Sequence, residues 1–202
     1  MSTRGLDANT PLGIHAECIV KEGFTFVARY YKATATCLSR SEALALSAAG
    51  LSIVTVVERG SPTHADYFSR ARGFGDGIFA WHKAQNEIRQ PTGAPVYFAV
   101  DYDASDADVA GPITEYFAGV HEAFGSKGPA EYPIGVYGSG LVCSHLLLHT
   151  PVTYSWLSMS KGWRGGHTFT GWNLNQTVGS SVCGVSVDLD ESNGHGGGFK
   201  VS

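Results

Sequence analysis

The sequence lacks the features that mark several large classes of protein. No run of basic residues could follow a phosphate backbone or an anionic lipid surface, and 14 Lys plus Arg against 18 Asp plus Glu give a net charge of -4. No uninterrupted apolar stretch approaches the roughly 18 residues that span a bilayer. We therefore expect neither a nucleic-acid partner nor insertion into a membrane.

Common cofactor and nucleophile motifs are also missing. No Gly-x-Gly-x-x-Gly follows the first expected strand, and no HExxH occurs. The "YGSG" stretch at 137–140 falls short of the Gly-x-Ser-x-Gly elbow of serine hydrolases. These absences argue against nucleotide, zinc and serine chemistry, and we expect no cofactor.

Cysteine is scarce and widely spaced. Cys18, Cys37, Cys143 and Cys183 form no CxxC pair, which argues against a zinc site and a thioredoxin-like motif. The opening "MSTRGLDANT" has no apolar core of a secretory signal. We favour free thiols in a protein made in the cytoplasm, with one or two disulfides as the alternative.

What the sequence does contain is a regular series of apolar, β-rich runs. The chain has 202 residues, 43% of them hydrophobic, which fits one domain with a sizeable core. Eight strands are predicted, at 4–8, 24–31, 51–57, 95–102, 133–137, 154–159, 169–175 and 184–190. Helices are predicted between most of them, at 39–50, 74–90, 105–126 and 139–148.

The alternation of strand and helix predicts the fold class. Continuous apolar strands indicate a parallel sheet covered by helices, and eight of them indicate a barrel. We predict an α/β, single-domain, irregular TIM-like (β/α)8 barrel over residues 1–192, with reduced helices in the C-terminal third. Residues 193–202, "NGHGGGFKVS", read as a flexible Gly-rich tail. An open doubly wound sheet is the alternative.

Acidic residues fall at the predicted ends of four strands. The side chains concerned are Asp7 on the first strand, Glu58 on the third, Asp101 and Asp103 on the fourth, and Asp188, with Asp190, on the eighth. Active sites of such barrels lie at the C-terminal ends of the strands, so these carboxylates are expected to meet at one mouth. Single acids at strand ends are ordinarily loop caps, but four such ends in one barrel favour a site.

Asp101 and Asp103 follow the most apolar strand, in the stretch "APVYFAVDYD". Residues two apart on a strand share a face, so both carboxyls are expected to point into the mouth. Repulsion between them would leave one protonated, which gives the acid and carboxylate that glycoside hydrolysis requires. The alternative is that Asp7, Asp101, Asp103 and Asp188 ligate a hard cation such as Mg²⁺ or Ca²⁺.

Aromatic and amide side chains near the strand ends are suited to binding sugars, because flat rings stack on pyranose faces while amides bind hydroxyls. The expected substrate-binding residues are Arg29, Tyr31, Tyr102, Tyr137, Trp172 and Gln176. Tyr30 and Trp156 also lie near strand ends, and packing in the barrel core is at least as good an explanation for Trp156.

The order of these motifs carries a family resemblance. "GLDAN", "VYFAVDYD", "IGVYGSG", "WLSMSKGW", "GWNLNQ" and "VSVDLDE" together resemble the glycoside-hydrolase-like domain first catalogued as domain of unknown function 1906. That family is similar to the family-25 lysozymes, whose groove is lined by a first-strand Asp, a fourth-strand Asp-x-Glu and an eighth-strand Asp. The resemblance implies Asp7, Asp101, Asp103 and Asp188 as site residues, and peptidoglycan as the substrate.

One position departs from the family-25 pattern. Asp103 stands where those lysozymes have the Glu that acts as general acid, and its carboxyl is about one methylene shorter. Three explanations are open: the sugar sits deeper, Glu58 supplies the proton, or the site is not that of a lysozyme.

The resulting hypothesis is a lysozyme-like peptidoglycan hydrolase, a muramidase acting as a monomer. Asp103 is expected to be the general acid and Asp101 the assisting carboxylate, with Asp7 and Asp188 tuning charge and Glu58 in reserve. Release by lysis, a holin or a specialised secretion system would bring it to the cell wall, as for an endolysin or an antimicrobial toxin. The alternatives are a carbohydrate-binding module without catalysis and a metal-dependent hydrolase.

Overall fold

Eight strands close into a barrel in sequential order, and this arrangement confirms the predicted fold class. The computed structural model describes residues 2–128 and 132–202. The strands are β1 (Thr3–Asp7), β2 (Phe26–Tyr31), β3 (Ser52–Val57), β4 (Val96–Ala99), β5 (Ile134–Gly138), β6 (Val152–Leu157), β7 (Leu174–Val182) and β8 (Val185–Ser192). Each successive pair from β1–β2 to β6–β7 is parallel, whereas β8 runs antiparallel to both β7 and β1.

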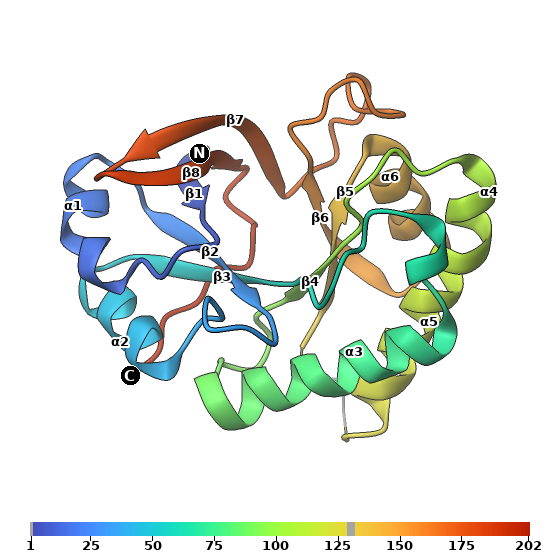
Figure 1. Ribbon diagram of the computed structural model, residues 1–202, viewed down its shortest axis with the longest axis horizontal. Coiled ribbons are helices and arrows are strands. Elements are labelled where there is room, and N and C mark those ends of the chain that lie inside the picture. Colours follow the sequence, from blue (N-terminus) through green and yellow to red (C-terminus); the bar gives the residue numbers. More distant parts are fainter. Residues whose placement is uncertain (1, 129–131) are drawn as a thin grey trace.

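Helices cover the outside of the barrel (Figure 1). They are α1 (Ala16–Lys21), α2 (Arg40–Ala48), α3 (Arg70–His82), α4 (Asp106–Asp108), α5 (Thr114–Gly125) and α6 (Gly140–His149), with π-helical turns at Lys83–Ile88 and Val109–Ile113. Ser39, Ser69, Ser105 and Ser139 each cap a helix through the side-chain oxygen. The four predicted helices are therefore present, whereas the short α1 was not predicted. No helix in the described part of the chain is long and apolar enough to cross a membrane.

The alternation of side chains along each strand produces two separate cores. On β2, Phe26 and Ala28 join the cluster inside the barrel, with Tyr30 packed against it. Val27 and Tyr31 belong to the larger cluster between the strands and the helices. Side chains at the top of the inner set are therefore the ones that reach the barrel mouth.

The last two strands depart from the predicted repeat. Strand seven was predicted at 169–175 but spans Leu174–Val182, and β8 follows it in a hairpin. The turn residues Cys183 and Gly184 have positive φ angles of 52° and 78°, as a two-residue hairpin turn requires. So short a connection makes the pair antiparallel, because a parallel crossover needs a dozen or more residues.

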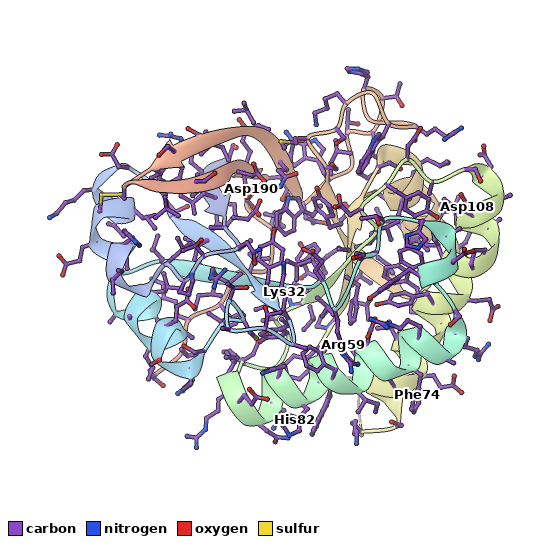
Figure 2. The ribbon with its side chains drawn as sticks, viewed as in Figure 1. Lys32, Arg59, Phe74, His82, Asp108 and Asp190 are labelled. Atoms are coloured by element: carbon purple, nitrogen blue, oxygen red, sulfur yellow. A yellow bond between two sulfur atoms is a disulfide. The ribbon has the colours of Figure 1, made fainter. Side chains whose placement is uncertain are left out.

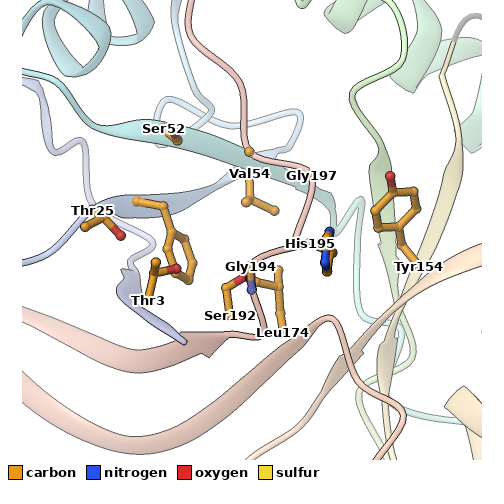
Figure 3. A pocket seen from close by; sticks show the side chains of 13 residues that line it. Thr3, Thr25, Ser52, Val54, Tyr154, Leu174, Ser192, Gly194, His195 and Gly197 are labelled. Carbon is orange, nitrogen blue, oxygen red and sulfur yellow. Dashed lines mark hydrogen bonds between the residues drawn. The ribbon is translucent and has the colours of Figure 1, made fainter. Parts of the chain in front are cut away.

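The C-terminal segment 193–202 differs from the flexible tail that we expected. Phe199 is buried and forms an antiparallel bridge with Ile53 of β3. Gly196 O accepts a hydrogen bond of 3.0 Å from Tyr97 Oη, and Val201 N donates to Ser47 Oγ over 3.0 Å. The segment borders a cavity of about 470 Å³ at the N-terminal end of the barrel, which Figure 3 shows with His195 and Tyr154 on its wall. Backbone pairing and a buried aromatic ring explain why this Gly-rich stretch is ordered.

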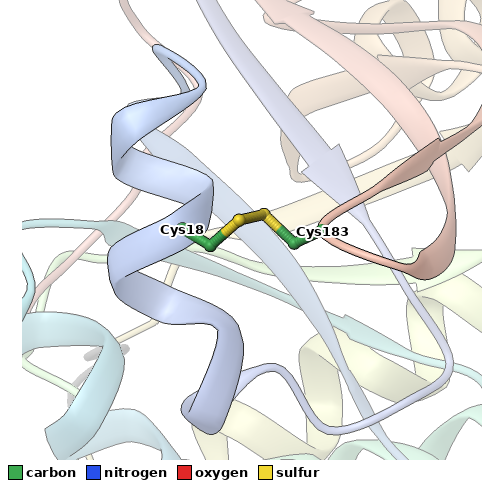
Figure 4. Close-up of a disulfide and its surroundings, with 2 residues drawn as sticks. All are labelled: Cys18 and Cys183. Atoms are coloured by element: carbon green, nitrogen blue, oxygen red, sulfur yellow. A yellow bond between two sulfur atoms is a disulfide. The ribbon is translucent and has the colours of Figure 1, made fainter.

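A disulfide joins Cys18 of α1 to Cys183 in the β7–β8 turn (Figure 4). The two cysteines are 165 residues apart in sequence, and their Cα atoms are 6.1 Å apart. The prediction of free thiols is therefore wrong for this pair, since closure of the barrel brings the two ends of the chain together. Cys37 and Cys143 are free.

Candidate active site at the barrel mouth

A pocket of about 280 Å³ opens among the C-terminal ends of the parallel strands. Residues on or just after strands β2 to β8, and residues in the connection after β6, build its wall. The wall combines carboxylates, aromatic rings and one amide. The lining residues are Tyr30, Val56, Glu58, Ala99, Asp101, Tyr137, Trp156, Met159, Ser160, Trp163, Gln176 and Asp188. This is the end of the barrel at which active sites of such folds lie.

Glu58 and Asp101 form the acidic part of the pocket that follows β3 and β4. Lys32 Nζ lies 3.2 Å from Glu58 Oε2 and 4.1 Å from the centre of the Tyr30 ring. Figure 2 shows Lys32 near the middle of the molecule. Burial raises the pKa of Glu58 and of Asp101 above the usual values, and the positive charge of Lys32 opposes both shifts. This side of the pocket therefore contains two carboxyls that retain their protons to a higher pH than exposed carboxyls do.

Asp7 lies beneath the pocket, at the end of β1, and is held by hydrogen bonds. Tyr30 Oη donates to its Oδ1 over 2.6 Å, and Gln176 Nε2 donates to its Oδ2 over 2.8 Å. Gln176 Nε2 also lies 3.4 Å from Asp188 Oδ2, and Tyr137 Oη donates to Gln176 Oε1 over 2.9 Å. Burial raises the pKa of Asp7 to about 6 despite these donors. Gln176 thus links two carboxylates to the aromatic wall.

Asp190 is a buried carboxyl one inward position below Asp188, and we expected it near the mouth but assigned it no role. Trp156 Nε1 donates to its Oδ1 over 2.9 Å. Burial, followed by the charge of Asp7, raises the pKa of Asp190 far above its usual value, and Asp190 Oδ2 is buried with no hydrogen-bond partner among the described residues. The "VDLD" alternation, which puts both aspartates on one face of the strand, was the signal in the sequence. Figure 2 labels Asp190 on its strand.

We expect the carboxyl pair Asp7–Asp190 to make folding stability depend on pH. The unfolded chain releases these protons near pH 4, whereas folded Asp7 retains its proton to about pH 6. The free energy of unfolding should therefore fall as the pH rises from about 4 to 6, by up to ~1.4 kcal/mol per pH unit for each proton. Asp190→Asn removes one of the two groups that retain a proton in the folded state, so this decline should become shallower. Urea unfolding from pH 4 to 8 measures the effect, and an identical pH dependence in the variant and the wild type would contradict it.

The structure places Asp103 outside the pocket. Strand β4 ends at Ala99, and Asp101 N donates to Pro62 O, so the alternation that would align the two aspartates stops before Asp103. The Asp103 carboxylate lies on the surface instead, where it forms an ion pair of 3.0 Å with Arg164 Nη1. The expectation that both carboxyls face the mouth is corrected to Asp101 alone.

Arg29 and Tyr31 also need correction, because they point away from the mouth. Arg29 is fully buried behind β2 and donates to Glu42 of α2 over 2.7 Å and 3.3 Å. Tyr31 Oη donates to Gln90 Oε1 over 2.9 Å. These contacts attach helices to the barrel. Tyr30, which lies between them on the opposite face, is the β2 residue in the pocket.

Among the other expected aromatic residues, Tyr137 lines the pocket but Tyr102 and Trp172 do not. The Tyr102 ring stacks on Phe68 with the ring centres 6.0 Å apart, between the strands and the helices. Trp172 precedes β7, where its carbonyl accepts a hydrogen bond of 2.9 Å from Asn193. The pocket wall instead includes Trp163, which we missed because the long connection after β6 has no periodicity to indicate its direction.

A hard-cation site was the other interpretation of the acidic residues. Within residues 2–128 and 132–202, no three His, Cys, Asp or Glu side chains are arranged to hold a metal ion. The geometry divides the acids instead: Glu58, Asp101 and Asp188 face the cavity, whereas Asp7 and Asp190 are buried on β1 and β8 outside its lining.

A closed barrel with carboxylates and aromatic rings at the C-terminal ends of its strands defines a glycoside-hydrolase-like domain. The chain belongs to the family described as "Rv2525c-like, glycoside hydrolase-like domain", whose model matches residues 17–195. Two uncharacterised Bacillus subtilis proteins are similar in sequence: YbfG, 31% identical over 163 residues, and FadG, 28% identical over 193 residues. The matches cover 74% and 89% of this chain but only 22% and 33% of those longer proteins.

Solved structures share the fold. The Mycobacterium tuberculosis Tat-secreted protein Rv2525c, in complex with HEPES, superposes with a TM-score of 0.80 at 22% identity, covering 97% of this chain and 98% of that one. The modular autolysin LytC of Streptococcus pneumoniae, in complex with a synthetic peptidoglycan ligand, gives a TM-score of 0.61 at 12% identity, covering 94% of this chain and 46% of that one. The resemblance to family-25 lysozymes is thereby confirmed at the level of the fold.

The comparison with Rv2525c also corrects the expected localisation. We expected a protein made without an export signal, which would reach the cell wall through lysis, a holin or a specialised secretion system. Rv2525c is described as Tat-secreted, and this finding contradicts that expectation.

Proposed function

We propose that the protein is an exported glycoside hydrolase that cleaves peptidoglycan in the manner of a lysozyme. The observation that carries the proposal is the pocket itself: three carboxyls with raised pKa values, Glu58, Asp101 and Asp188, share a cavity with aromatic rings. The peptidoglycan-bound autolysin with the same fold supports the choice of polymer.

Asp101 is the proposed general acid. Its carboxyl faces the cavity, and the structure places no hydrogen-bond donor on it from any described side chain. Burial raises its pKa, so it keeps a proton to a higher pH than an exposed Asp does. In the first step it would protonate the departing glycosidic oxygen, and in the second it would accept a proton from the attacking water.

Glu58 is the proposed carboxylate partner. Lys32, 3.2 Å from Glu58, opposes the effect of burial and favours the ionised form. A charged Glu58 would stabilise the oxocarbenium-like transition state or form the bond to the sugar. The carboxyls of Asp7 and Asp188, connected through Gln176, would add negative potential on the opposite side of the mouth.

Hydrolysis of purified peptidoglycan tests the proposal. We expect reducing ends to accumulate with time, in the presence of EDTA as in its absence. Release of muropeptides with intact stem peptides would show that a sugar bond is cleaved and not an amide. Saturable binding without product at long incubation would contradict the enzymatic proposal.

A binding module without catalysis is the second candidate, and one observation favours it. Asp103, which occupies the position of the family-25 general acid, is engaged by Arg164 and does not face the pocket. In that case binding of glycan would survive substitution of Asp101, and wild-type protein would release no product.

A further inference from the structure

The connection between β6 and β7, residues 158–173, has no helix and forms part of the pocket wall. Figure 1 shows it in orange, projecting beyond the ends of β5 and β6. It supplies Met159, Ser160 and Trp163 to the cavity, whereas the remaining lining residues belong to the barrel strands or directly follow them. The shape of this side of the pocket therefore depends on how the loop is held.

Asp103 and Arg164 hold this loop against the loop that follows β4. Asp103 Oδ1 accepts a hydrogen bond of 2.8 Å from Arg164 N, and Oδ2 accepts one of 3.0 Å from Arg164 Nη1. Arg164 Nη1 also donates to the carbonyl of Asp103 over 3.2 Å. On its other side, Arg164 O accepts a hydrogen bond of 2.8 Å from Leu141 N at the start of α6. The residue next to Trp163 is thus fixed through both its backbone and its side chain.

We propose that Trp163 is the side chain on which a pyranose ring of the substrate stacks, and that Asp103 is a positioning residue that holds Trp163 in the pocket through Arg164. This inference rests on the proposed glycan specificity of the pocket. It gives Asp103 a function other than that of the general acid, and it assigns ligand binding to a loop that the strand pattern did not indicate.

The exposure of the residues supports this division of roles. Trp163 is half-buried, so part of its ring surface remains available to a ligand, whereas Trp156 is 1% exposed and packs inside the barrel. The Asp103 and Arg164 side chains are 40% and 49% exposed, and ion pairs this open contribute little to global stability. Three hydrogen bonds to one residue instead restrict the geometry of the loop.

Binding of chitotetraose, a soluble oligosaccharide of N-acetylglucosamine, tests the inference without any need for turnover. Tryptophan fluorescence and calorimetry would measure the Kd. We expect Trp163→Phe to weaken binding about tenfold and to remove most of the fluorescence change, because a smaller ring offers less stacking surface. Trp172→Phe, near the end of the same connection but outside the pocket, is the matched control and should bind as the wild type does.

The contact between Asp103 and Arg164 predicts that the effects of substituting the two residues are not additive. Asp103→Ala removes both bonds to its carboxylate and should raise the Kd about tenfold, whereas Arg164→Ala keeps the bond from Arg164 N and should raise it less. The double variant should lose less than the product of the two single effects, because the bond from Arg164 Nη1 to Asp103 Oδ2 is lost in both. Asp106→Ala removes a neighbouring exposed aspartate and should leave the Kd unchanged. Thermal unfolding should shift little in all of these variants.

Several results would overturn the inference. Wild-type affinity in Trp163→Phe, or absence of binding by the wild type to both chitotetraose and a solubilised peptidoglycan fragment, would exclude stacking on Trp163. A thousandfold loss of kcat in Asp103→Asn with an unchanged Kd would make Asp103 an acid and not a positioning residue. Binding with the expected variant pattern but without hydrolysis would contradict the proposed enzymatic activity alone.

Discussion

Replacing Asp101 with Asn is expected to reduce hydrolysis of peptidoglycan by about three orders of magnitude. A positioned acid-base group contributes up to about 10⁴-fold, and Asp101 is proposed to act in both steps. Asn preserves the size of the side chain but cannot donate a proton to the leaving oxygen. The initial rate of reducing-end release from purified peptidoglycan measures the loss, and unchanged thermal unfolding shows that the fold is intact.

Two matched variants make this prediction specific. Glu58→Gln should also lose activity strongly, because it removes the charge that is proposed to stabilise the transition state. Asp103→Asn should retain most of kcat, since Asp103 lies outside the pocket and is paired with Arg164. Full activity in Asp101→Asn, or equal losses in Asp101→Asn and Asp103→Asn, would contradict the assignment.

The pH dependence of activity provides a further test of the role of Asp101. Burial raises the pKa of Asp101, and the acid must be protonated for the first step. Activity should therefore fall as the pH rises through that raised pKa. Loss of this alkaline limb in Asp101→Asn, measured on the residual activity, would attribute the limb to Asp101.

Removing the disulfide between Cys18 and Cys183 is expected to produce the largest loss of stability. The bridge closes a loop with a sequence separation of 165, for which restriction of the unfolded chain gives about 5 kcal/mol. Native disulfides typically contribute about 2–5 kcal/mol when removed. The variant Cys18→Ser with Cys183→Ser should therefore unfold about 10 °C lower than the wild type.

The two free cysteines provide the control for that measurement. Cys37→Ser should leave the melting temperature nearly unchanged, because Cys37 is partly exposed and unbridged. Burial raises the pKa of Cys143 to about 12, so this thiol should resist alkylation in the native state. Reduction of the wild type by dithiothreitol should reproduce the shift of the double variant. An equal melting temperature before and after reduction would show that the bridge contributes nothing.

The disulfide also bears on where the protein folds. Bridges of this kind form and persist in oxidising compartments and are rare in the cytosol. The export proposed above would bring the chain into such conditions. Cysteine spacing alone could not show this, because Cys18 and Cys183 become neighbours only when β8 closes the barrel against β1.

The sequence by itself determined the class of fold and the position of most of its parts. Seven of the eight predicted strands matched closely, which placed Asp7 and Glu58 at strand ends, whereas the seventh was predicted several residues too early. Apolar spacing, with Ser caps at some of the starts, predicted four helices. These signals are local: a buried strand requires a continuous apolar run, and a helix start requires its own hydrogen-bond acceptor. Tyr137 was expected near the mouth for the same reason and lines the pocket. Gln176 also lines it, but as the third residue of β7 and not as a residue just beyond the strand predicted at 169–175.

Only the tertiary structure decided which side chains meet. Because β4 ends at Ala99, the alternation of the strand does not carry Asp103 to the same face as Asp101. The alternation along β2 directs Tyr30 inward and Arg29 outward. Shifts of one or two residues decide such outcomes, and apolar strands buried on both faces carry no alternation that would reveal them. Trp163 and the Cys18–Cys183 bridge depend on contacts between distant segments, which form only once the barrel is closed.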